Sequence, residues 1–165
     1  AFAPMVPTDL PDFDPLKNAS DDEKAVFAIV RAWAPDLKER FLKWQEEYMA
    51  GDPANDFKDA DEDTKKWLET DDAKFRLAQK ALAFESGVDG WMLDEYSMLT
   101  PYGFDVSTIK KPLLIITGDK DVNVDMSCSV WLHENNPGSE LKIYPGMGHS
   151  RVFALDTIAE ALATF

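Results

Sequence analysis

The sequence has little cysteine, few cationic residues and no long apolar run, and each shortage excludes a class of protein. Cys128 is the single cysteine among 165 residues, so the chain can form no internal disulfide, and nothing in it marks an oxidising compartment. Only 17 Lys and Arg stand against 31 Asp and Glu. The resulting formal net charge of −14 would repel a phosphate backbone, so we expect no nucleic-acid partner.

Membrane insertion is also not expected from the sequence. No apolar run approaches the ~20 residues that a membrane-spanning helix needs, and no basic-then-apolar leader opens the chain. We therefore expect a soluble protein of the cytoplasm or an organelle, with no membrane span. The 45% of hydrophobic residues is ordinary for a globular chain, and 165 residues suit one compact domain.

Helical patterns fill the chain from about residue 20 to residue 99. The opening "AFAPMVPTDLPDFDP" is rich in proline, which removes backbone donors and fixes φ, so residues 1–15 are predicted to be an irregular linker. Ser20 followed by Glu23 is a capping-box pattern and starts a predicted helix over about 20–33. Apolar residues recur at helical spacing in four more segments, with a polar loop over 51–63 between the first two: 36–50, 61–69, 72–85 and 91–99.

The last third of the chain changes to an alternation of strands and helices. The apolar, β-branched run from Leu113 to Thr117 is bounded by Pro and Gly, as expected for a strand buried on both faces. A helix over "MSCSVWLHENN", a strand in "ELKIYPG" and a closing helix in "FALDTIAEALATF" follow. This order predicts a parallel βαβ unit. Two parallel strands do not make a stable sheet alone, so the chain is expected to carry part of a larger sheet.

The loops that follow the two strands carry the candidate chemistry. A right-handed βαβ connection brings both loops, "GDKDVNVD" and "PGMGHS", to the same edge of the sheet. If the strands are neighbours, about 4.8 Å apart, Asp121 and His149 could touch. A carboxylate on imidazole Nδ1 fixes the tautomer and leaves Nε2 free to take a proton, which is what general-base catalysis needs. Gly146 and Gly148 would allow the sharp turn that aims the ring outward.

The final third, "PYGFDVSTIKKPLLIITGDKDVNVDMSCSVWLHENNPGSELKIYPGMGHSRV", resembles the C-terminal part of an α/β-hydrolase, and the helical stretch before it resembles that family's cap. The resemblance implies an α/β fold class: a C-terminal portion of an α/β-hydrolase sheet with a preceding all-helical cap. It divides the chain into a strand end with the linker into the cap at 1–15, a cap at 16–99 and a core segment at 100–165. It also makes Asp121 the triad acid and His149 the triad histidine.

The sequence departs from this family at the nucleophile. Family members carry it in a G-x-S-x-G elbow ahead of the acid and the histidine, and no serine here has both flanking glycines. The expected partner is therefore the N-terminal part of the same hydrolase, on the same precursor or on a separate chain, although "AFAP" could instead be a processed N-terminus. The expected reaction is cleavage of an ester, amide or related bond in a small apolar or acyl-type substrate, without a cofactor.

Other interpretations remain open at this point. The chain could be a non-catalytic, hydrolase-derived interaction subunit of a larger complex. A calcium loop starting at Asp119 is disfavoured, because the EF-hand pattern needs a glycine at its sixth position and an acid at its twelfth, and both positions hold valine. His133 is expected at the surface and Cys128 in the core. Trp91 and Met92 are candidates for an apolar substrate pocket.

Overall fold

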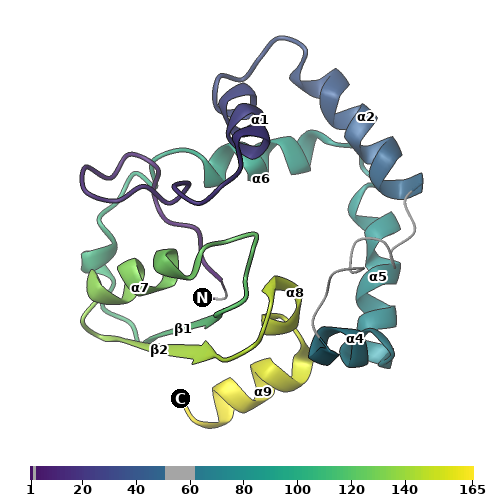
Figure 1. The fold of residues 1–165 in the computed structure, drawn as a ribbon. Helices are drawn as coiled ribbons and strands as arrows, with labels where there is room; N and C mark the ends of the chain where they lie inside the picture. The colour runs from purple at the N-terminus through teal and green to yellow at the C-terminus, as the bar shows by residue number, and fades with distance from the viewer. Residues whose placement is uncertain (2, 51–61) are drawn as a thin grey trace. The chain divides into compact units, whose positions relative to one another are not determined.

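The computed structural model describes residues 1, 3–50 and 62–165, and the chain divides into two compact units. We call them the α/β unit, which comprises Ala1–Val6, Asp59–Lys74 and Gly103–Phe165, and the helical unit, which comprises Pro7–Lys58 and Phe75–Tyr102. Figure 1 shows their elements. Most of the polar loop predicted over 51–63 lies outside the described residues. No helix in the described ranges is long and apolar enough to cross a membrane.

The helical unit is built from amphipathic helices whose apolar sides meet. Its elements are α1 (Asp21–Arg31), α2 (Leu37–Ala50), the later turns of α5 (Asp71–Ala83), and α6 (Asp89–Met98). At the start of α1, the Ser20 hydroxyl accepts the Glu23 N–H while the Glu23 carboxylate accepts the Ser20 N–H, so the predicted capping box is present. Helix α1 ends in a left-handed turn, with φ of 48° at Trp33.

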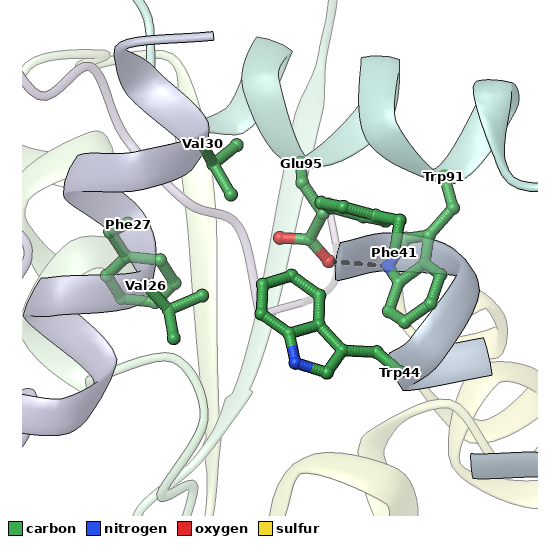
Figure 2. Close-up of a pocket in the computed structure, with 7 residues that line it drawn as sticks. All are labelled: Val26, Phe27, Val30, Phe41, Trp44, Trp91 and Glu95. Carbon is green, nitrogen blue, oxygen red and sulfur yellow. Dashed lines mark hydrogen bonds between the residues drawn. The ribbon is translucent and has the colours of Figure 1, made fainter. Parts of the chain in front are cut away.

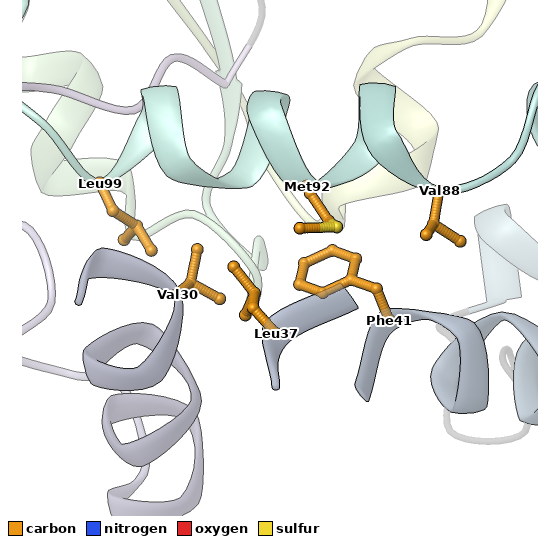
Figure 3. Close-up of a cluster of buried hydrophobic side chains, with 6 residues drawn as sticks. All are labelled: Val30, Leu37, Phe41, Val88, Met92 and Leu99. Carbon is orange, nitrogen blue, oxygen red and sulfur yellow. The ribbon is translucent and has the colours of Figure 1, made fainter. Parts of the chain in front are cut away.

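One apolar cluster holds the helical unit together. Helix α6 contacts both α1 and α2, and Figure 3 shows the side chains of the three helices meeting along one line. The buried members are Val30, Leu37, Phe41, Val88, Met92 and Leu99, each at most 5% exposed. Burying a side chain of this size stabilises a fold by about 1.5–3 kcal/mol, so this cluster is the main cohesive element of the unit.

The α/β unit carries the sheet. Its elements are α4 (Glu62–Leu68), the short 3₁₀ helix η1 (Val106–Thr108), β1 (Leu113–Gly118), α7 (Met126–Glu134), β2 (Ser139–Tyr144), α8 (His149–Val152) and α9 (Leu155–Ala163). Strands β1 and β2 pair in parallel, as the sequence predicts. Helix α7 contacts both strands, and α8 contacts β1.

Strand β1 is buried on both faces and bonded along both edges. Residues from Leu114 to Gly118 are all buried. Ala3 N–H donates to Ile116 O at 2.7 Å, and Ile116 N–H donates to Ala1 O at 2.9 Å. Both polar groups of Ile116 therefore point to the edge opposite β2, because the N–H and C=O of one strand residue lie on the same side. The continuous apolar run of β1 fits this interior position.

Candidate active site

The candidate site lies where β1 and β2 end, because parallel strands bring their carboxyl ends to the same edge of a sheet. The two strands pair in register from Leu113↔Ser139 to Gly118↔Tyr144, so their last residues are direct neighbours. Each strand is followed by one of the two loops that carry the predicted acid and histidine. The sheet thus sets the separation of the two loops.

The two loops contact each other through their backbones, and Gly118 permits this contact. A Cβ atom on Gly118 would lie 2.0 Å from the carbonyl oxygen of Met147, a distance that would force the backbones apart. That carbonyl accepts a hydrogen bond from Lys120 N–H at 3.0 Å, and Gly146 N–H donates to Asp119 Oδ1 at 2.6 Å. Gly146 has a φ of 76°, which a residue with a side chain adopts only with strain.

The Asp121 carboxylate is fully buried and bonded through both oxygens. Its Oδ1 accepts the backbone N–H groups of Asn123 and Val124, both at 2.9 Å. Its Oδ2 lies 2.8 Å from Nδ1 of His149, and the side chain is 0% exposed. A buried carboxylate is tolerated where charge-assisted hydrogen bonds replace its hydration, as they do here. Asp121 therefore serves both as the cap of its own turn and as the partner of His149.

His149 is the first residue of α8, and its side chain is 28% exposed. Since Asp121 can only accept a hydrogen bond, Nδ1 carries the proton in the neutral ring, and Nε2 is the nitrogen left for proton exchange. The Phe153 ring meets the imidazole edge to face, with the ring centres 5.1 Å apart. The imidazole is thus oriented on one side by a carboxylate and on another by an aromatic ring.

A bidentate ion pair fixes the short helix that carries His149. Arg151 donates from its two terminal nitrogens to the two oxygens of Asp156, at 2.6 and 2.7 Å. It also donates to the buried Thr157 hydroxyl at 2.7 Å. The hydrogen bond to Arg151 lowers the pKa of Asp156. These bonds tie α8 to the first turn of α9. They therefore restrain the helix on which His149 lies.

The structure separates the other sequence candidates from this pair. His133 is half-buried, with Nδ1 2.8 Å from Ser139 Oγ, and Cys128 is fully buried on α7. In the described part of the chain, no group of three or more His, Cys, Asp or Glu is arranged to hold a metal ion. Over the same residues, His149 has no hydroxyl or thiol as a hydrogen-bond partner. Sequence reasoning missed Arg151 and the role of Gly118, since neither belongs to a motif.

The helical unit contains a cavity of about 220 Å³. Of the two pocket residues expected from the sequence, Trp91 lines it and Met92 does not. Figure 2 shows its lining: Val26, Phe27, Val30, Phe41, Trp44, Trp91 and Glu95. Trp91 is part of that wall. Met92, the next residue of α6, is 5% exposed within the buried cluster of Figure 3 and does not line the cavity. Side chains of adjacent residues point about 100° apart around a helix axis, so Trp91 can face the cavity while Met92 faces the buried cluster.

Comparison with solved structures gives a likeness that bears on this arrangement. The chain is similar to the crystal structure of bromoperoxidase from Bacillus anthracis, with a TM-score of 0.51 and 23% sequence identity. The match covers 88% of this chain but 48% of that protein, so this chain spans about half its length. The likeness supports an α/β-hydrolase-like fold. No protein-family profile and no curated protein sequence matches the chain. The two-stranded parallel sheet is consistent with the tail of such a fold, present in part.

Proposed function

We propose that this chain is the C-terminal part of an α/β-hydrolase that cleaves an ester, amide or related bond by nucleophile–His–Asp catalysis. The observation that carries the proposal is the contact between Asp121 Oδ2 and His149 Nδ1 at 2.8 Å. A fully buried carboxylate on one imidazole nitrogen, with the ring itself part-exposed, is the arrangement a general base needs. The nucleophile lies outside this chain, because no serine here sits in a G-x-S-x-G elbow.

In the proposed reaction the proton moves through Nε2 of His149. The base takes the proton of the attacking hydroxyl while the nucleophile bonds to the substrate carbonyl carbon, and Asp121 stabilises the imidazolium that forms. The imidazolium then returns the proton to the leaving group as the carbonyl–heteroatom bond breaks. Water repeats both steps to release the acyl group. The substrate is a small apolar or acyl-type molecule, and no metal or organic cofactor takes part.

The test uses the complete protein, with the N-terminal part on the same polypeptide or co-expressed as a second chain. Hydrolysis of a p-nitrophenyl ester should fall by ~10³-fold or more in kcat when either Asp121 or His149 is changed to Ala, since triad members act as a unit. His133→Ala is the matched control, because it removes the other histidine of the chain. Unchanged hydrolysis in both active-site variants would overturn the assignment.

The same variants address two neighbouring possibilities. Since the structural neighbour is named a bromoperoxidase, peroxide-dependent bromination should be assayed beside ester hydrolysis. A non-catalytic interaction subunit is the other candidate, favoured by the missing elbow. In that case the Asp121→Ala protein would still bind its partner, and the wild-type complex would show neither activity. The division into a strand end with the linker into the cap at 1–15, a cap at 16–99 and a core segment at 100–165 remains part of the proposal.

A further inference from the structure

The cavity of the helical unit combines aromatic walls with a single charged group. Three helices contribute to it: α1 provides Val26, Phe27 and Val30, while the other walls come from α2 and α6 (Figure 2). Its volume of about 220 Å³ is below the ~300–1,000 Å³ of pockets that enclose drug-sized ligands. It therefore suits a small molecule or one end of a larger one.

The aromatic walls are fixed by contacts with one another. The Phe41 ring is 1% exposed and packs edge to face against Trp44 and Trp91, with ring centres 5.0 and 4.7 Å apart. Trp91 in turn packs edge to face against Phe84 at 5.3 Å. Rings held at such angles keep their positions when the cavity is empty, so ligand binding need not first order the walls.

Glu95 places a carboxylate at this cavity, and in the part of the chain that the structure describes only one of its oxygens has a hydrogen-bond partner. Its Oε1 accepts the Trp91 indole N–H at 3.0 Å. Figure 2 shows the other oxygen directed away from Trp91, toward the side of Val30 and Phe27. Glu95 is half-buried and, within the described residues, forms no ion pair. The indole bond orients the carboxylate without neutralising its charge.

We propose that this cavity binds a small organic cation, with an alkylammonium group between the aromatic walls and Glu95. Aromatic faces attract cations, and desolvated sites strengthen the attraction. A neutral ligand would cover the carboxylate without pairing it, which costs free energy, and an anion would be repelled. An inorganic cation such as calcium would need several oxygen ligands, whereas this wall offers one carboxylate. The site belongs to the helical unit, so the proposal does not rest on hydrolysis in the α/β unit.

The experiment compares choline with its uncharged carbon isostere, 3,3-dimethylbutan-1-ol, at constant ionic strength. Binding to the complete protein is measured by calorimetry and by the indole N–H signals of Trp44 and Trp91. Choline should bind saturably, shift both signals, and bind ~10-fold or more tightly than the isostere. Glu95→Gln should remove that preference while retaining an oxygen for the Trp91 bond. Glu46→Gln, an exposed change on α2, is the matched control and should leave binding unchanged.

Three results would overturn the proposal: no saturable choline binding, equal affinity for choline and the isostere, or an unchanged choline affinity in Glu95→Gln. Retained dispersion of the indole signals shows that the variant is folded, so a loss of affinity can be assigned to the charge. Choline binding should persist in His149→Ala. The failure of this site and the failure of the hydrolase proposal are therefore distinguishable.

Discussion

Asp121 shows how one residue can cap its own turn and bond a histidine of another loop at the same time. Oδ1 is occupied by the two N–H groups of its own loop, so Oδ2 is left to face His149. The local hydrogen bonds fix the direction of the carboxylate before the histidine is considered. An aspartate that caps a turn in this way carries little rotational freedom, and the geometry of the pair follows from it.

Replacing Asp121 by Asn should reverse the ring tautomer of His149 while keeping the turn. The amide oxygen can still accept the N–H groups of Asn123 and Val124, but the amide NH₂ then faces Nδ1 and donates to it. The neutral ring would carry its proton on Nε2 instead of Nδ1. The ¹⁵N shifts of the imidazole measure this directly. A ring that keeps its proton on Nδ1 in the variant would contradict the orienting role given to Asp121.

Gly118 is predicted to be irreplaceable for a steric reason. In Gly118→Ala the new Cβ would meet the Met147 carbonyl at 2.0 Å, so β1 and the histidine loop must separate. We expect a loss of about 3 kcal/mol in the free energy of unfolding, as for an overpacked core, together with a longer Asp121–His149 distance.

Gly90→Ala is the control for this prediction, since no atom lies within 4 Å of the position where its Cβ would stand. That change should be neutral or stabilise by up to ~1 kcal/mol, because alanine favours helix. Urea unfolding of the two variants measures both effects. A Gly118→Ala protein as stable as Gly90→Ala would mean that the two loops do not approach as closely as described.

The pairing of Asp121 with His149 could be predicted because each residue follows a strand, and parallel strands end at one edge. The close contact at Gly118 could not be predicted from the sequence. Gly118 is simply the last residue of a strand, and Met147, which it contacts, lies far away in sequence. His133 is half-buried, and its partner Ser139 opens the following strand only six residues along the chain.

Among the elements, α8 shows what a sequence pattern cannot reveal. Its four residues, His149–Val152, make a single turn, too short for apolar periodicity to be recognised. Strand β1 is the opposite case, because a continuous apolar run between Pro and Gly is a strong local signal. Helix α6 begins at Asp89, so Gly90 lies inside its first turn and not ahead of it.

The ion pair between α8 and α9 should contribute to stability in a pH-dependent way. Arg151→Lys keeps the charge but cannot bond both oxygens of Asp156, so we expect a loss of about 1 kcal/mol at pH 7. The pKa of Asp156 is lowered from 3.8 in the folded state. The stabilisation is therefore complete well above pH 3.8 and is lost as the pH falls through the lower folded-state value.

Urea unfolding of wild type and Arg151→Lys at a series of pH values measures this effect. The difference between the two proteins should shrink in acid. Arg40→Lys is the matched control, because Arg40 bonds Asp36 in an exposed pair far from His149 in sequence. It should change stability by less than about 0.5 kcal/mol and leave ester hydrolysis unaffected. A difference for Arg151→Lys that is the same at every pH would argue against the Asp156 pair as its source.

At the scale of the whole molecule, the unusual feature is how few strands the described sheet has. The described residues form a two-stranded parallel sheet, extended on the β1 side by the backbone of Ala1 and Ala3. Parallel sheets occur almost only where helices cover both faces, and parallel strands pair slightly less stably per residue than antiparallel ones. The solved structure that this chain resembles belongs to a protein of which the chain spans about half, since the match covers 48% of it.

If the hydrolase proposal is right, the 165-residue chain alone should expose incomplete sheet surface. Purified by itself, it should bind a hydrophobic dye such as ANS strongly and elute as aggregates in size-exclusion chromatography. Adding the N-terminal part should abolish both effects, because new strands would cover the edges. A denaturing mass spectrum of the native protein shows whether that part is on the same polypeptide or a second one. A monomer of this chain that unfolds cooperatively and binds no dye would show that the two strands suffice, and the sheet would then need no partner.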